Sequence, residues 1–293
     1  MQNPALSILS NDGTVRGFII NSRELVQNAF ELHQTAPVVT AALGRLLSAA
    51  VMMGKTLKNP GDLITLQIEG EGPVKTLLAT AGANGNVKGY AGNPLVDIPL
   101  KSNGKLDVSG AVGPGFLTVL RDNETGEPYV SRTALVSGEI AEDITGYYAQ
   151  SEQTPSICAL GVLVDRDYTV KSSGGFLIQL MPGAEEATIC RLEENLQKFQ
   201  NVSALFEYTS NEEIAQMLMD QIPFHITEQW NAAYYCNCSK KRTEKVLLSL
   251  GRQELMQLIQ EQKPVELCCH FCNRKYQFSR KELEALLIEG AEK

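Results

Sequence analysis

Hydrophobic residues follow strand-like and helix-like patterns in turn over the first 180 residues. Two apolar runs, residues 6–9 and 15–20, flank an Asp-Gly turn and predict a strand pair. A long apolar run from Val38 to Lys58 predicts a helix that ends at Asn59-Pro60-Gly61. Further strands are predicted at residues 63–69, 74–79, 87–90, 116–121, 129–135, 159–164 and 176–180, and helices at 22–32 and 139–150. The pattern predicts an α+β core domain over residues 1–180, with sheet and helices around one core and the strand order left open.

A different pattern begins at residue 181. Residues 184–231 hold nine acidic and two basic residues, yet apolar residues recur at spacings of three and four between residues 189 and 199. Ser210 and Glu213 form a capping box for another helix. The pattern predicts an amphipathic helical linker over residues 181–231. Because such short helices are unstable alone, we expect their apolar faces to pack on the core domain.

The composition is that of an ordinary soluble globular protein. The chain has 293 residues, of which 43% are hydrophobic and 20% charged, and its formal net charge is -8. This acidic balance disfavours neutralisation of nucleic-acid phosphates. The N-terminus lacks a secretory signal pattern, and the apolar run at residues 38–53 is too short to span a bilayer and contains Arg45. We therefore expect a cytoplasmic protein that binds neither nucleic acid nor membrane.

Cysteine and charge separate the C-terminal end from the rest of the chain. Residues 232–293 hold 11 basic and 8 acidic residues and predict a small C-terminal domain. Five of the seven cysteines lie there: Cys236, Cys238, Cys268, Cys269 and Cys272. In a reducing compartment such a cluster indicates a metal site rather than structural disulfides. The two remaining thiols, Cys158 and Cys190, are expected to be small buried apolar residues.

The cysteines form two close pairs, Cys236-Asn237-Cys238 and Cys269-His270-Phe271-Cys272, with 30 residues between them. Zinc takes four ligands at tetrahedral corners, and two pairs from distant segments supply that arrangement. Apolar and other residues alternate from Val265 to Cys269 on a predicted strand, so Cys268 should face away from Cys269, and Cys269 is the better ligand. The sequence therefore predicts one Zn²⁺ per chain, in the reduced state, held by Cys236, Cys238, Cys269 and Cys272.

Several longer motifs carry a resemblance to a known family. They are Y-Y-C-N-C-S, C-H-F-C-N-R-K-Y-Q-F, A-P-V-V-T-A-A-L-G-R-L-L-S-A-A, S-E-Q-T-P and S-G-G-F-L-I-Q-L-M-P. Over essentially its whole length the chain resembles the redox-regulated 33 kDa chaperonin family of bacteria. The resemblance implies a holdase for unfolding client proteins, inactive when reduced and zinc-bound and active after oxidation at raised temperature. It also implies redox-active disulfides Cys236–Cys238 and Cys269–Cys272 and a homodimer on activation, while Cys268 is additional to the motif and leaves disulfide exchange open.

The residues themselves support a switch of this kind. A domain of about 60 residues has only marginal stability from its core, so loss of the metal is expected to unfold it. Unfolding would release the linker, whose apolar stripes and carboxylates suit the holding of unfolding clients in solution.

Two other functions stay open at the level of sequence. Basic residues beside both cysteine pairs are compatible with a zinc-ribbon nucleic-acid-binding protein. Cys269 and Cys272 could instead serve a thiol oxidoreductase, although such enzymes usually place C-x-x-C at the start of a helix. The body contains no recognisable catalytic motif, so we expect no catalytic residues and a binding protein rather than an enzyme.

Overall fold

The computed structural model describes residues 3–123, 126–261 and 264–289, and it has the expected mixed α+β architecture. The chain forms two compact units, Met1–Tyr235 and Cys236–Lys293, which we call unit 1 and unit 2. The last four residues of the predicted C-terminal domain, 290–293, lie outside the described residues.

Unit 1 is built on a sheet of ten strands within the described part of the chain. Its strands in sequence order are β1 (Asn3–Ser10), β2 (Val15–Asn21), β3 (Leu63–Gly70), β4 (Thr76–Gly82), β5 (Asn86–Ala91), β6 (Gly115–Asp122), β7 (Tyr129–Ala134), β8 (Ser156–Val164), β9 (Val170–Leu180) and β10 (Phe224–Tyr234). Their order across the sheet is β7-β6-β3-β4-β5-β10-β1-β2-β9-β8. The strand pair predicted near the N-terminus is confirmed, because β1 and β2 pair antiparallel from Ala5↔Ile20 to Leu9↔Arg16.

The two halves of this sheet meet at β10. Most of β10 pairs antiparallel with β1, from Asn3↔Ala232 to Ser10↔Phe224. Its last residues, Ala233 and Tyr234, pair in parallel with β5. One strand therefore belongs to both halves and joins them.

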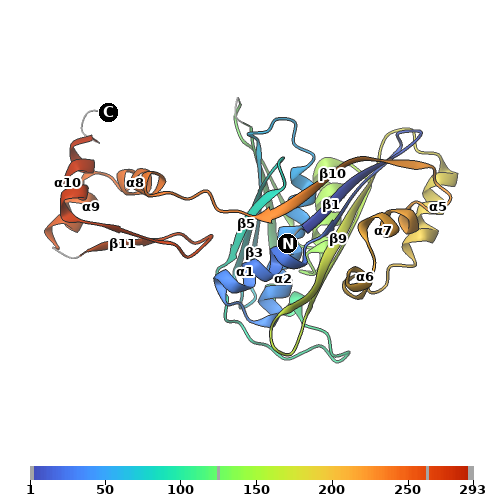
Figure 1. Ribbon diagram of the computed structural model, residues 1–293, viewed down its shortest axis with the longest axis horizontal. Helices are drawn as coiled ribbons and strands as arrows, with labels where there is room; N and C mark the ends of the chain where they lie inside the picture. Colours follow the sequence, from blue (N-terminus) through green and yellow to red (C-terminus); the bar gives the residue numbers. More distant parts are fainter. Residues whose placement is uncertain (1–2, 124–125, 262–263, 290–293) are drawn as a thin grey trace. The chain divides into compact units, whose positions relative to one another are not determined.

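Helix α2 (Pro37–Gly54) lies in the core between the two halves and contacts β4 and β5 as well as β8 and β9 (Figure 1). It is long and apolar enough to cross a membrane, but 89% of it is buried inside the fold, as in the core helix of a soluble protein. It ends four residues before the predicted Lys58, because the chain turns at Gly54 and Leu57 N–H bonds back to Gly54 O. Around it lie α1 (Arg23–His33), α3 (Val108–Val112), α4 (Ala141–Tyr147) and the π-helical turn Tyr148–Glu152.

Three short helices cover the other face of the β1, β2 and β9 part of the sheet: α5 (Glu186–Leu196), α6 (Val202–Tyr208) and α7 (Asn211–Leu218) (Figure 1). Their apolar side chains form one buried cluster with those of the strands, and we call it the linker cluster. It consists of Leu6, Ile8, Val15, Ile19, Phe176, Ile178, Leu192, Phe206, Ile214, Ala215, Leu218, Met219 and Ile222. The Ser210 and Glu213 capping box is confirmed at the start of α7.

The predicted helical linker is wrong at its C-terminal end. Residues 224–231 belong to β10 and not to a helix. Apart from Glu228, apolar and polar residues alternate from Phe224 to Ala232, which is the pattern of a strand, and the prediction of a helix missed this signal. Its backbone hydrogen bonds with β1, more than 200 residues away, decide the conformation.

Unit 2 contains α8 (Lys240–Ser249), α9 (Arg252–Gln260), the hairpin β11 (Val265–Cys268) and β12 (Lys275–Phe278), and α10 (Arg280–Glu289). Its core is small. The buried residues are Leu247, Leu255, Phe278, Leu283 and Leu286. Such a core provides limited stability to a domain of this size.

Candidate metal centre

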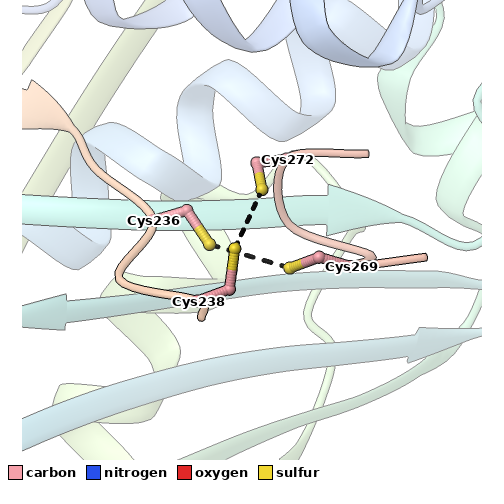
Figure 2. Close-up of side chains that lie close together, drawn as sticks. All are labelled: Cys236, Cys238, Cys269 and Cys272. Carbon is pink, nitrogen blue, oxygen red and sulfur yellow. Dashed lines mark hydrogen bonds between the residues drawn. The ribbon is translucent and has the colours of Figure 1, made fainter. Parts of the chain in front are cut away.

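Unit 2 brings four cysteine sulfurs together. The Sγ atoms of Cys236, Cys238, Cys269 and Cys272 all lie within 4.8 Å of one another (Figure 2). Two of the sulfur–sulfur separations join the two segments, at 3.7 Å for Cys236–Cys269 and 3.4 Å for Cys238–Cys272. Sulfurs around a tetrahedral zinc lie about 3.8 Å apart, so this group has the size of a four-thiolate zinc site. The four cysteines could therefore hold a metal ion.

Local structure places each cysteine pair. Cys238 lies just before Ser239, the N-cap of α8, whose side chain accepts a hydrogen bond from Arg242 N–H in the first turn. Cys269 and Cys272 lie in the turn between β11 and β12, where Cys272 N–H donates to Cys269 O and Cys269 N–H donates to Arg274 O. The turn thus presents both thiols on one side, as a zinc knuckle requires.

Tyr276 on β12 is a member of the site that the sequence did not predict. Its hydroxyl donates a hydrogen bond to Cys238 Sγ at 3.1 Å. Burial by itself raises the pKa of the Cys238 thiol, but hydrogen bonds from Tyr276 and the neighbouring thiols outweigh burial and lower that pKa to about 7. The only signal in the sequence is a tyrosine four residues after Cys272, and only the hairpin register turns it toward the sulfurs.

The pKa values of two neighbouring thiols shift in the opposite direction. Burial raises the pKa of the Cys272 thiol to about 12, and it also raises the pKa of the Cys236 thiol.

The other three cysteines lie outside the group of four. Cys268 is exposed. Cys158 is buried as expected, but the prediction that Cys190 is buried is wrong, because it lies on the exposed side of α5.

The position of the C-x-x-C pair bears on the oxidoreductase alternative. Cys269 and Cys272 lie in a hairpin turn with a second cysteine pair within reach, and not at the start of a helix. The helix-start geometry that activates the cysteine pair of thiol oxidoreductases is therefore not the arrangement here.

Comparison with known proteins decides the family. The family model described as "Hsp33 protein" matches residues 4–279. The chain belongs to the Hsp33 family. It is 46% identical to the 33 kDa chaperonin of Lachnoclostridium phytofermentans over 94% of this chain and 95% of that protein, and 45% identical to the 33 kDa chaperonin of Clostridioides difficile over 99% and 100%. The crystal structure of the Hsp33 homologue of Thermotoga maritima matches all of both chains with a TM-score of 0.92 at 35% identity.

Hsp33 proteins are chaperones, and the chain is thus a member of a chaperone family. Membership confirms the resemblance carried by the sequence motifs. A chaperone binds unfolded client proteins, so the family also gives the general class of partner.

Proposed function

We propose that this chain is a redox-regulated holdase of the cytoplasm, inactive when reduced with one Zn²⁺ on Cys236, Cys238, Cys269 and Cys272. Oxidation at raised temperature activates it to hold unfolding clients. The observation that carries the proposal is the convergence of four sulfurs within 4.8 Å in an Hsp33 chain.

The donor set fits zinc. Four sulfurs at separations of 3.4 and 3.7 Å suit a soft-ligand tetrahedral site, and a bound Zn²⁺ would keep them as thiolates. Thiolates are the form of cysteine that peroxide attacks. One thiolate attacks the O–O bond of the peroxide, which gives a sulfenic acid and hydroxide, and condensation of the sulfenic acid with a second thiol gives a disulfide and water.

Disulfide formation changes the geometry of the site. The sulfurs of a disulfide lie about 2.05 Å apart, well short of the 3.4 Å between Cys238 and Cys272. We propose disulfides Cys236–Cys238 and Cys269–Cys272, each within one segment. Such pairing leaves no sulfur link between the two segments, and the small core of unit 2 then has to hold them alone.

The functional division of the chain follows from this. We propose a core domain at residues 1–180, a linker at 181–231 and a redox-switch domain at 232–293. Release of α5, α6 and α7 would uncover the linker cluster on both the helices and the strands. Apolar surface beside the carboxylates of residues 184–231 would hold clients while keeping the complex soluble. Dimerisation on activation is part of the same proposal.

The test asks whether zinc release and exposure of the linker helices occur together. Reduced, zinc-loaded protein is treated with peroxide at two temperatures, and zinc release, hydrogen exchange of α5–α7 and aggregation of a denatured client are followed together. We expect zinc loss, deprotection of the linker helices and suppression of aggregation to occur under the same conditions. Zinc loss that leaves the linker helices protected, or client holding by the reduced protein, would contradict the proposal.

A further inference from the structure

Strand β8 is an edge strand of the unit 1 sheet, next to β9 alone in the strand order. A cavity of about 980 Å³ runs beside it. All seven residues from Cys158 to Val164 line the cavity, and the opposite walls come from Arg45, the loop at residues 100–106, the start of α4 and residues 200–203. An edge strand offers main-chain groups that no neighbouring strand pairs, and here the cavity lies beside the part of the edge that α4 does not cover.

Hydrogen bonding along β8 identifies which main-chain groups face the cavity. Cys158 N–H donates to Thr145 Oγ1 of α4 at 3.0 Å and therefore points away from β9. Because the hydrogen-bonding direction alternates along an antiparallel strand, the N–H and C=O of Leu160 and Val162 point the same way. Within the described residues, the structure gives these two main chains no hydrogen bond to any element outside the β8–β9 pair. Both residues are more than nine-tenths buried.

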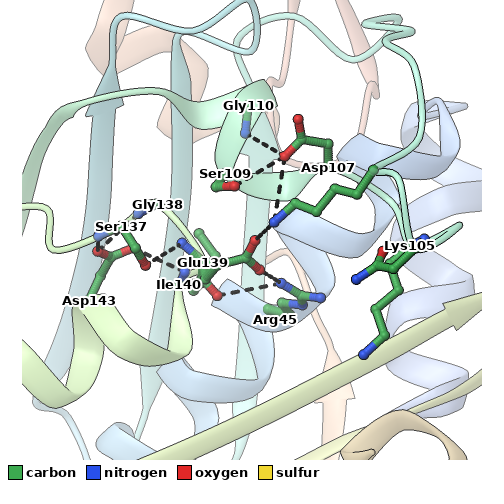
Figure 3. A network of polar contacts seen from close by, with 12 residues as sticks. Arg45, Lys105, Asp107, Ser109, Gly110, Ser137, Gly138, Glu139, Ile140 and Asp143 are labelled. Carbon is green, nitrogen blue, oxygen red and sulfur yellow. Dashed lines mark hydrogen bonds and ion pairs between the residues drawn. The ribbon is translucent and has the colours of Figure 1, made fainter.

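The charges that line the cavity are mostly positive. The basic residues are Arg45, Lys101, Lys105 and Arg166, and the acidic residues are Glu139 and Glu142. The carboxylate of Glu139 already pairs with Arg45 Nη1 at 2.7 Å and with Lys101 Nζ at 2.5 Å (Figure 3). Lys105 and Arg166 have no ion-pair partner among the described residues. The rim therefore attracts an anionic partner.

The wall that carries Glu139 is fixed in place. Asp143, a buried residue of α4, accepts main-chain hydrogen bonds from Val136, Ser137, Gly138 and Ile140 (Figure 3). This network holds the turn that leads into α4, and with it the Arg45–Glu139 ion pair. The cavity is thus bounded by a preorganised wall, which favours binding because little has to be ordered.

We propose that this cavity accepts an extended polypeptide segment with acidic side chains, which adds to β8 as a further strand. The main chains of Leu160 and Val162 pair with the segment, and Lys105 and Arg166 contact its carboxylates. The proposal rests on the proposed function, because a client caught while unfolding supplies such extended segments. A second copy of this chain fits less well, since pairing β8 with β8 would bring two positively charged rims together.

The test uses the full-length protein after activation with peroxide, and fluorescent seven-residue peptides, with binding measured by anisotropy. The first peptide alternates valine and glutamate, the second replaces glutamate with lysine, and the third is the acidic peptide with alternate backbone nitrogens methylated on the pairing edge. We expect binding of the acidic peptide, weakened at least about tenfold by methylation and by the lysine replacement. Equal binding of the methylated acidic peptide would overturn the proposal, since the cavity would then capture anions without pairing a backbone.

Variants locate the site. The double variant Lys105→Glu/Arg166→Glu should weaken binding of the acidic peptide about fivefold or more, whereas Lys58→Glu, an exposed charge reversal outside the cavity, should not change it. Val162→Pro removes a main-chain N–H that points away from β9, so the pairing with β9 is kept. It should weaken binding of the acidic peptide to a similar extent. Unchanged peptide binding in the double variant would overturn the inference. So would a protein that binds no peptide but forms a dimer that Val162→Pro dissociates, because the edge of β8 would then pair with a second copy of the chain.

The client assay separates this inference from the function on which it rests. Suppression of client aggregation by the oxidised protein, without peptide binding, would reject the strand site alone. Peptide binding without any suppression of aggregation would keep the site and reject the proposed function.

Discussion

Tyr276 and Glu282 illustrate how single residues stabilise unit 2. Tyr276 donates to a sulfur of the candidate metal centre, and Glu282 closes the first turn of α10 by accepting from Ser279 N–H at 2.8 Å. Glu282 also pairs with Lys240 at 2.5 Å. The contacts of Tyr276 with Cys238 and of Glu282 with Lys240 join residues that are 38 and 42 positions apart in the chain.

Replacement of Tyr276 by phenylalanine should weaken zinc binding by about tenfold, because a hydrogen bond to a ligand sulfur is lost while the ring is kept. Competition with a chromogenic chelator measures the affinity. Tyr129→Phe, at an exposed tyrosine of unit 1, serves as the control and should bind zinc as the unaltered protein does. An unchanged affinity in Tyr276→Phe would mean that this hydroxyl does not support the site.

Glu282 makes the stability of unit 2 fall as the pH becomes acid. Hydrogen bonds from Lys240 and Ser279 lower the pKa of Glu282 to about 2, below its value in the unfolded chain. The stabilisation is therefore present above about pH 4.5 and is lost as the pH falls toward 2. We expect Glu282→Gln to lower the thermal midpoint of unit 2 by about 2–4 °C at pH 7, and the difference from the unaltered protein to shrink below about pH 4. A difference independent of pH would contradict this.

At the scale of elements, the docking of α6 depends on a glycine in β8. A Cβ at Gly161 would lie 2.3 Å from the main-chain nitrogen of Ser203, so no larger residue fits beneath the start of α6. Phe206, further along α6, belongs to the linker cluster and packs against Gly174 of β9. A glycine thus fixes a contact that the hydrophobic pattern alone does not specify.

Gly161→Val should push α6 away from the sheet, with a loss of about 1–3 kcal/mol from overpacking. We expect faster hydrogen exchange in α6 and α7 and, if the proposed function holds, some suppression of client aggregation without oxidant. Gly126→Val is the matched control, because nothing lies within 4 Å of a Cβ at Gly126. Normal protection of α6 in the Gly161 variant would show that the helix does not need this approach.

At the scale of the whole molecule, the two units differ in what holds them together. Unit 1 has a ten-stranded sheet around a buried helix, whereas unit 2 has five buried apolar side chains and a two-stranded hairpin in its described part. A structural zinc site can contribute about 10–16 kcal/mol to the folding of a small domain, more than such a core supplies.

Metal removal should therefore affect the units unequally. Chelation of the reduced protein is expected to abolish hydrogen-exchange protection around Leu247, Leu255 and Phe278, while the strands of unit 1 remain protected. Added zinc should restore the protection. Equal protection of unit 2 with and without metal would remove the basis of the proposed switch.

Much of the fold and the candidate site is predictable because it depends on neighbouring residues. The α+β class, the β1–β2 hairpin, the buried helix α2 and the Ser210 and Glu213 capping box follow from periodicity and turn chemistry. Likewise, the two cysteine pairs are recognisable as a group because zinc geometry restricts the spacing of its ligands.

Features that depend on residues far apart in the chain are visible only in the tertiary structure. The pairing of β10 with β1, the edge position of β8, the exposure of Cys190 and the contact of Tyr276 with Cys238 were not evident beforehand. Main-chain pairing uses groups that every residue carries, so local side-chain patterns do not specify which strands meet. The sequence by itself determined which metal-binding and apolar residues the chain carries and at what spacing. The tertiary structure decided which of these residues lie next to one another and which remain exposed.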